Sequence, residues 1–186
     1  MKKITYVTGN AFKVAGIKLV LEPLGYEIDN IKMETPEIQA DDVSDVAKYS
    51  AKWAAEKLSI PVLKNDSWLF VNWLRWFPGV YTHYVEDTIG EDGLLKLMEQ
   101  LEDRSAYFKE FIAYCEPGGE PVVFESFTKG KIDIKKSGTY GWSRDFVFIP
   151  DGENQTLWCF TDEERVRFWS SDAYTQLARY LEEIGK

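Results

Sequence analysis

The sequence has little of several features that mark common functional classes. It contains two cysteines, Cys115 and Cys159, without CxxC spacing, and one histidine, His83, so we expect neither a zinc site nor a disulfide framework. The net charge is −9 and basic residues are not clustered, which argues against a nucleic-acid partner. The sequence has no apolar stretch of membrane-spanning length and no signal peptide, so we expect a cytoplasmic protein with free, buried thiols and no membrane partner.

What the chain does contain supports a folded core. Hydrophobic residues make up 45% of the 186 residues and aromatic residues 15%, which is enough to exclude disorder as the default. The seven tryptophans exceed what a core of this size usually requires, so an aromatic stacking surface is also expected. We interpret residues 1–186 as a single domain of two lobes.

The order of expected elements is that of a mixed α/β protein, with helical crossovers early and hairpins in the middle. Apolar periodicity and turn signals predict strands at 4–7, 26–33, 61–67, 106–115, 121–127, 130–134 and 146–150, and helices at 12–24, 42–58, 93–101, 162–168 and 172–184. Residues 69–74 fit either a strand or a helix. The simplest architecture is one α/β unit with a long, mixed central sheet and flanking helices.

The first candidate site is the segment Thr8-Gly9-Asn10, followed by Lys13. It closes a strand and opens a helix, where a glycine permits close backbone approach and free N–H groups attract an anion. Taken alone, the segment is more typical of an ordinary strand-to-helix turn with a surface lysine.

Three further residues add chemistry that is weak singly and coherent together. Glu37 lies in a Pro-containing loop, Asp66 at the end of an apolar strand, and Lys52 on a helix whose other face is apolar. Each has a plain structural alternative: a solvated loop residue, a helix cap and a surface lysine. Two carboxylates can hold one Mg²⁺, and lysines such as Lys13 can balance a triphosphate.

Several motifs in order carry a resemblance to a known family. They are Thr8-Gly9-Asn10-x-x-Lys13, Pro36-Glu37-Ile38-Gln39, Asp66-Ser67, Phe77-Pro78-Gly79-Val80-Tyr81, Asp103-Arg104-x-Ala106-Tyr107-Phe108, Lys129-Gly130-Lys131-Ile132 and Gly141-Trp142-Ser143-Arg144-Asp145. In spacing they resemble the inosine triphosphate pyrophosphatases, which remove deaminated purine nucleotides. The resemblance covers nearly the whole chain.

This resemblance implies a fold, a reaction and a set of roles. The fold would be an elongated mixed sheet with two lobes around a central groove, usually as a homodimer. The reaction would convert a nucleoside triphosphate and water to the monophosphate and pyrophosphate, with Mg²⁺. By position, the catalytic residues would be Asp66, Lys13 and Glu37, the metal ligands Glu37 and Asp66, and the substrate-binding residues Thr8, Gly9, Asn10, Lys13, Lys52, Ser67, Trp142, Arg144 and Asp145.

The sequence also departs from the family pattern. Asn65 stands where the family usually has an acidic residue, Trp68 where it has a small one, and Arg144 where an aromatic is common. The family's C-terminal Ser-His-Arg motif is missing, since residues 165–172 contain no histidine. The phosphate-and-metal half of the site therefore looks retained, whereas the base-recognition half looks rebuilt.

These departures leave alternatives open. The first hypothesis is an active pyrophosphatase with altered base preference, in which Trp142 still stacks on the base. New hydrogen-bond donors would come from Arg144, Arg165 or Arg167. The second is a weak or inactive nucleotide-binding relative with a regulatory role, whose pocket Trp142, Trp158 and Trp169 could close by packing together. A generic interaction protein is the third, and the ordered motifs argue against it.

Overall fold

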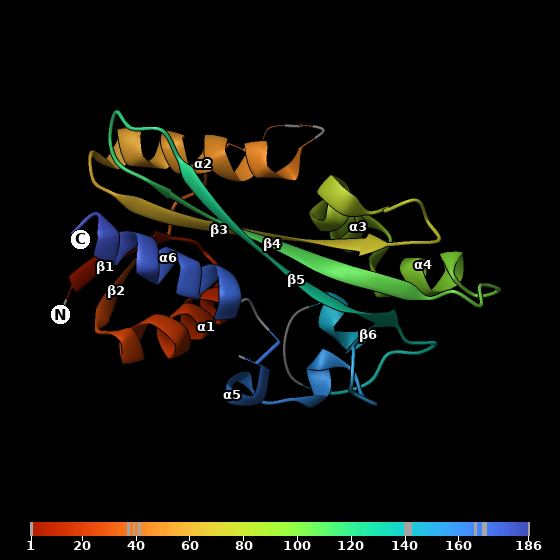
Figure 1. Cartoon of the computed structure of the whole chain (residues 1–186). Coiled ribbons are helices and arrows are strands. Elements are labelled where there is room, and N and C mark those ends of the chain that lie inside the picture. The colour runs from red at the N-terminus through yellow and green to blue at the C-terminus, as the bar shows by residue number, and fades with distance from the viewer. Residues whose placement is uncertain are drawn as a thin grey trace. The chain divides into compact units, whose positions relative to one another are not determined.

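A computed structural model describes residues 2–36, 38, 40, 42–139, 143–165, 167–168 and 171–185. Within these residues the strands form one six-stranded sheet of order β2-β1-β3-β4-β5-β6 (Figure 1). The strands are β1 (Lys2–Val7), β2 (Tyr26–Ile31), β3 (Val62–Val71), β4 (Ser105–Cys115), β5 (Val122–Ile132) and β6 (Phe148–Pro150). Because β1 runs parallel to β2 and β3 while β5 and β6 are antiparallel, the predicted mixed α/β sheet is confirmed.

Helices flank this sheet. The α-helices are α1 (Ala11–Leu21), α2 (Val43–Leu58), α3 (Thr82–Thr88), α4 (Gly90–Leu97), α5 (Asp162–Arg165) and α6 (Ser171–Glu183). Short 3-10 turns are η1 (Glu22–Leu24), η2 (Gly79–Tyr81), η3 (Ser143–Phe146) and η4 (Leu157–Cys159). Among the described helices, none is long and apolar enough to cross a membrane.

Several element boundaries differ from the sequence prediction. Residues 69–71 continue β3 and residues 72–74 form a turn, so the open choice at 69–74 is resolved as a strand only for its first half. The separate strand expected at 130–134 is wrong, because β5 runs without a break to Ile132. Helix α3 was not predicted, since its only buried residues are Thr82 and Val85 and one buried apolar side chain gives no helical periodicity.

The chain divides into two compact units, and β3, β4 and β5 contribute to both. Unit 1 comprises Met1–Asp66, Glu110–Ser126 and Ser170–Lys186. In this unit α1 and α6 cover one face of the strands, and Figure 1 shows α2 on the opposite side from α6. The core under α1 and α6 contains Ile4, Tyr6, Ile17, Leu21, Tyr26, Ile28, Leu63, Ile112, Tyr114, Phe124, Ala173, Tyr174, Leu177, Ala178 and Leu181.

Helix α2 forms where the sequence predicted it. The side chain of Asp42 caps it by accepting a hydrogen bond from the Ser44 N–H at 2.8 Å. Residues at three- and four-residue spacing are buried on one side, and the helix ends at Ser59, whose φ of 56° is left-handed.

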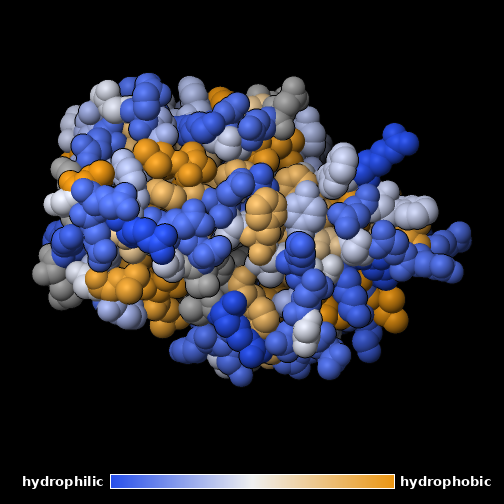
Figure 2. Space-filling view, viewed as in Figure 1, coloured by the Kyte–Doolittle hydropathy of each residue, from blue (hydrophilic) through white to orange (hydrophobic). Residues whose placement is uncertain are grey.

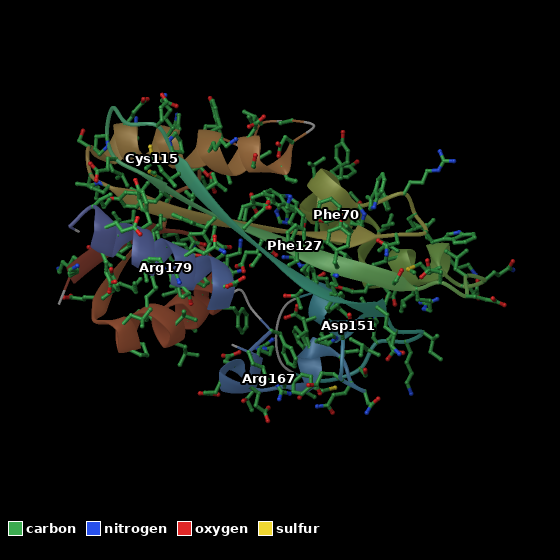
Figure 3. The ribbon with its side chains drawn as sticks, in the orientation of Figure 1. Phe70, Cys115, Phe127, Asp151, Arg167 and Arg179 are labelled. Carbon is green, nitrogen blue, oxygen red and sulfur yellow. The ribbon has the colours of Figure 1, made fainter. Side chains whose placement is uncertain are left out.

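Unit 2 comprises Ser67–Lys109 and Phe127–Trp169 and has a core of its own. That core contains Leu69, Val71, Leu94, Met98, Ala106, Phe108, Ile132, Val147, Phe148 and Leu157. A second aromatic group includes Phe70, which is stacked on Tyr107 with ring centroids 4.9 Å apart, and Phe127, which tilts against Tyr107 at 6.0 Å (Figure 3). The face of the molecule in Figure 2 is mainly hydrophilic, with apolar side chains in separate small groups.

Candidate active site

The turn between β1 and α1 is organised by its own side chains. Asn10 Oδ1 accepts hydrogen bonds from the N–H groups of Phe12 at 2.9 Å and Lys13 at 3.2 Å, so Asn10 is the N-cap of α1. The Asn10 N–H in turn donates to Thr8 Oγ1 at 3.1 Å. Two N–H groups at the helix start are therefore used within the protein, and a phosphate at this turn has to rely more on side-chain donors than the sequence suggested.

Lys32 lies beside this turn and was not identified from the sequence. Strands β1 and β2 run parallel with Val7 opposite Ile31, so Thr8 and Lys32 leave the sheet at the same edge. Lys32 is exposed, and a Cβ built on Gly9 would lie 3.6 Å from Lys32 Cε. The signal that could have found Lys32 is its place directly after the second parallel strand, where ligand sites of such sheets gather.

Lys13 reaches from the first turn of α1 to β3. Its Nζ donates to the backbone oxygen of Asn65 at 3.0 Å, and the residue is half-buried. The structure thus brings the predicted phosphate-binding lysine next to the residue that precedes Asp66.

Asp66 lies in the interior of β3. The expectation that it ends a strand is wrong, because apolar residues continue the strand to Val71. Asp66 is half-buried and, by the alternation of strand residues, shares its face with Lys64. Lys64 Nζ donates to Thr35 Oγ1 at 3.0 Å, so this face of β3 contacts the loop that precedes residue 37.

Glu37 itself lies outside the described residues. The two residues before it are held in place: Thr35 by Lys64, and Pro36 through its carbonyl, which accepts a hydrogen bond from Ser50 of α2 at 3.4 Å. The approach of Glu37 to Asp66 stays a prediction, and the anchoring of the preceding loop on the Asp66 face supports it.

The structure pairs Lys52 with a residue that the sequence had not connected to it. Its Nζ donates to Glu120 Oε1, at 2.5 Å, in the turn between β4 and β5. This hydrogen bond raises the pKa of the Lys52 ammonium, so the pairing with Glu120 favours the charged form. A phosphate would have to compete with Glu120 for it.

In unit 2, Arg144 is held by two neighbours. Its guanidinium donates to Glu86 Oε1 and to Ser67 Oγ, each at 2.9 Å, and lies 5.2 Å from the Phe108 ring centroid. The structure thus brings together Ser67 and Arg144, two predicted substrate-binding residues. Trp142, the predicted stacking residue, lies outside the described residues.

Asp145 is buried in an ion pair. It is 2% exposed, and its Oδ2 accepts a hydrogen bond from Arg165 at 3.1 Å. Arg165, itself 4% exposed, also donates to Asp162. An Asp145 carboxylate held in this way neutralises Arg165, so contact with a base requires this pair to rearrange.

Other residues considered for the base pocket are also engaged. Arg167 pairs with Glu153 at 3.1 Å and lies over the Phe168 ring. Trp158 stacks on Phe146, with ring centroids 3.6 Å apart. A cavity of about 20 Å³, lined in part by Glu86 and Arg144, has room for roughly one water molecule and not for a base.

The Asp66 carboxylate is a donor of the kind that a magnesium ion accepts. Among the described residues no three His, Cys, Asp or Glu side chains form a metal-binding group. Mg²⁺ usually takes only one or two protein carboxylates and completes its shell with waters and phosphate oxygens. The partly exposed Asp66 carboxylate fits that requirement, with Glu37 as the predicted second ligand.

Comparison with known proteins gives a consistent result. The model of the Ham1 family matches residues 4–173. A dITP/XTP pyrophosphatase of Methanopyrus kandleri is 42% identical over 155 residues, which cover 83% of this chain and 82% of that protein. A dITP/XTP pyrophosphatase of Thermococcus kodakarensis is 41% identical over 182 residues, covering 97% and 98% respectively.

Solved structures agree on the fold. The structure of the Staphylococcus aureus Ham1 protein superimposes with a TM-score of 0.80 over 98% of this chain and 99% of that one, at 24% identity. At this identity the likeness establishes the architecture and leaves the chemistry to the closer relatives.

Proposed function

This chain belongs to the Ham1 family, and from that premise we propose that it hydrolyses a deaminated purine nucleoside triphosphate to the monophosphate and pyrophosphate. The observation that carries the proposal is identity above 40%, over almost the whole chain, to a relative named dITP/XTP pyrophosphatase. The resemblance predicted from the sequence motifs is thereby confirmed. The cap geometry at Asn10 and the position of Lys13 support the same function.

The reaction breaks the anhydride bond between the α-phosphorus and its bridging oxygen to the β-phosphorus. A water oxygen becomes bonded to the α-phosphorus, and pyrophosphate leaves with the bridging oxygen. In phosphoryl chemistry the protein contributes mainly position and charge. Lys13 and Lys32 would bind phosphate oxygens beside Thr8, Gly9 and Asn10, and Lys52 would contribute when released from Glu120.

Asp66 and Glu37 would hold Mg²⁺, which when bound neutralises phosphate charge. Asp66 also carries a partly exposed carboxylate next to Asn65, whose backbone oxygen holds Lys13, so it is well placed to orient the attacking water and accept its proton. Loss of Asp66 would remove both contributions.

Base recognition would fall to unit 2. Trp142 would stack on the base, with Arg144 as hydrogen-bond donor from its position between Glu86 and Ser67. Asp145 would act on the base only indirectly, by fixing Arg165. A site whose donors differ from those of its relatives is expected to differ in base preference.

A homodimer in the cytoplasm completes the proposal. Trp73, Trp76 and Tyr84 of unit 2 are 59%, 62% and 68% exposed, and aromatic side chains of this kind are enriched in protein interfaces. Cys115 and Cys159 carry free thiols; Cys115 is buried as predicted, whereas the prediction of a buried thiol is wrong for Cys159, which is half-buried. Light scattering on the purified chain gives the oligomeric state directly.

The test of the function is a panel assay. Pyrophosphate release is measured with the triphosphates of inosine, xanthosine, adenosine, guanosine, cytidine and uridine, each with Mg²⁺ and with a chelator. We expect Mg²⁺-dependent turnover of at least one deaminated purine nucleotide. Nucleotide binding without turnover of any would favour the regulatory alternative and refute the proposal.

A further inference from the structure

Unit 1 contains a buried acidic residue to which the reaction assigns no role. Glu110 of β4 is 9% exposed, and Asn65 of the neighbouring strand β3 is 5% exposed. The Asn65 Nδ2 donates to Glu110 Oε1 and also to the hydroxyl of Tyr174 at 3.1 Å. The Asn65 side chain is thus fixed by two partners from other elements.

This pair sits where the apolar face under α1 and α6 ends. Alternate residues of a strand point to one face, so Asn65 follows Leu63 in one row, and Glu110 precedes Ile112 in the next. Leu63 and Ile112 both belong to the apolar core of unit 1. The side chains of Asn65 and Glu110 therefore lie on the same sheet face as the apolar core, directly beside Leu63 and Ile112 along their strands.

Asn65 connects Glu110 to the phosphate-and-metal half of the site. Its backbone oxygen accepts the hydrogen bond of the Lys13 ammonium at 3.0 Å. The next residue along β3 is Asp66. A displacement of Asn65 would therefore move a contact of Lys13 and the backbone that carries Asp66.

Stability alone gives no reason for a buried, hydrogen-bonded polar pair at this place. Burying an ionised carboxylate is unfavourable, and replacing buried polar partners by apolar groups of similar shape is often neutral or stabilising. The pKa of the nearby Tyr6 hydroxyl is raised well above its ordinary value, first by burial and then by Glu110. Buried charges that are unfavourable for folding are concentrated at functional sites.

We propose that Glu110 is a positioning residue of the pyrophosphatase reaction: by accepting the Asn65 hydrogen bond, it fixes the Lys13 ammonium and the Asp66 carboxylate relative to each other. The proposal rests on the proposed function of that site. In this role Glu110 acts through Asn65 and need not touch the substrate.

The experiment compares three variants with the wild-type chain. The double variant Asn65→Leu/Glu110→Met removes both polar partners and fills the space with apolar atoms. Glu110→Gln removes the charge and keeps an oxygen that accepts the Asn65 hydrogen bond. Glu125→Gln, at an exposed position of the adjacent strand β5, is the matched control for loss of a strand carboxylate.

We expect the double variant to melt at or above the wild-type temperature while its kcat falls about a hundredfold, because misplacement of reacting groups by about 1 Å has that effect. Glu110→Gln should restore kcat to within about fivefold of wild type, since the hydrogen bond is retained. Calorimetry with a non-hydrolysable triphosphate analogue, without metal, should show affinity reduced about tenfold in the double variant, because Lys13 is displaced.

Three results would overturn the proposal: wild-type kcat in the double variant, a Glu110→Gln variant as impaired as the double variant, or an effect of equal size in Glu125→Gln. Should the wild-type chain hydrolyse no nucleotide, the proposed function fails by itself. Calorimetric binding of the triphosphate analogue without metal then tests separately whether Glu110 positions Lys13. Unchanged affinity in the double variant would contradict that role.

Discussion

The two compact units use charged side chains in different ways. In unit 1, Lys13, Asp66 and Lys52 are all partly exposed, the two lysines on helices and Asp66 within β3. In unit 2, Asp145 and Arg165 are buried and paired with each other. The family resemblance assigns Lys13, Asp66, Lys52 and Asp145 to substrate or metal, whereas Arg165 lies where the family motif is missing.

The comparison distinguishes charged side chains that a ligand can contact from charged side chains that stabilise the fold. A partly exposed lysine can exchange its partner for a phosphate with little loss of protein contacts, whereas breaking a buried ion pair leaves an unpaired charge in the interior. We infer that unit 1 retains its ligand chemistry, and that the buried Asp145–Arg165 pair of unit 2 acts first on structure.

The largest effect is expected from Arg165→Met in unit 2. The substitution leaves the Asp145 carboxylate buried without this partner, which destabilises a protein by about 3–5 kcal/mol. Thermal melting followed by circular dichroism should show Tm lowered by roughly 6–20 °C for a chain of this size.

Arg167→Met is the matched control, because the Arg167 side chain is 56% exposed and its pair with Glu153 is a surface pair. We expect it to change stability by less than about 1 kcal/mol. Equal melting temperatures for the Arg165 and Arg167 variants would contradict a structural role for the Asp145 pair.

The next effect is expected in unit 1, from Asp66→Asn. The change is nearly isosteric and removes the charge proposed for Mg²⁺ and the attacking water, so kcat should fall at least about a hundredfold with Tm almost unchanged. Steady-state release of pyrophosphate measures this. Asp151→Asn, at an exposed position of unit 2 (Figure 3), is the control; a similar kcat in both variants would refute the assignment.

Lys13→Ala should weaken triphosphate binding about tenfold, or about 1.4 kcal/mol, while stability changes by roughly half a kcal/mol or less. The reason is that Lys13 is a half-buried residue of the first turn of α1, outside the apolar core, whose ammonium donates to the backbone oxygen of Asn65. Calorimetric titration of a triphosphate analogue checks the affinity. The exposed Lys57→Ala on α2 is the control, and a large loss of stability with unchanged affinity would argue for a structural lysine.

The sequence predicted the parts of this site that depend on local signals. Asn10 after a strand and Asp42 before an apolar periodic segment both cap helices, and both helices form as expected. The same local pattern predicts the position of Lys13, because the first turn of α1 directly follows its N-cap, Asn10.

Contacts between strands could not be predicted in this way. Glu110 and Asn65 are 45 residues apart, and nothing within β4 distinguishes Glu110 from an exposed strand residue. The position of Lys32 beside the turn after β1 depends on β2 running parallel to β1, which the structure shows. The pairing of strands that are distant in sequence brings these residues together, and a single sequence specifies that pairing only indirectly.

The smallest effect is expected at Lys52, where the sequence and the structure suggest different partners. Glu120 holds its ammonium at 2.5 Å, and the Glu120 side chain is 85% exposed. Surface ion pairs of this kind are weak, so a phosphate can displace Glu120 at little loss. Lys52→Ala should therefore reduce triphosphate affinity by only about threefold.

The variant Glu120→Gln tests directly whether Glu120 competes with phosphate for Lys52. The hydrogen bond that Lys52 donates to Glu120 raises the pKa of Lys52 above its ordinary value. When the carboxylate is removed, the lysine returns toward its ordinary, still high, pKa and the ammonium stays charged. If Lys52 binds phosphate, Glu120→Gln removes a competitor and tightens triphosphate binding by about twofold to threefold. That gain must disappear when Lys52→Ala is added. If the wild type, Glu120→Gln and the double variant bind the triphosphate equally well, Lys52 does not bind phosphate. The phosphate-binding lysine of unit 1 would then be Lys13, at the turn before α1.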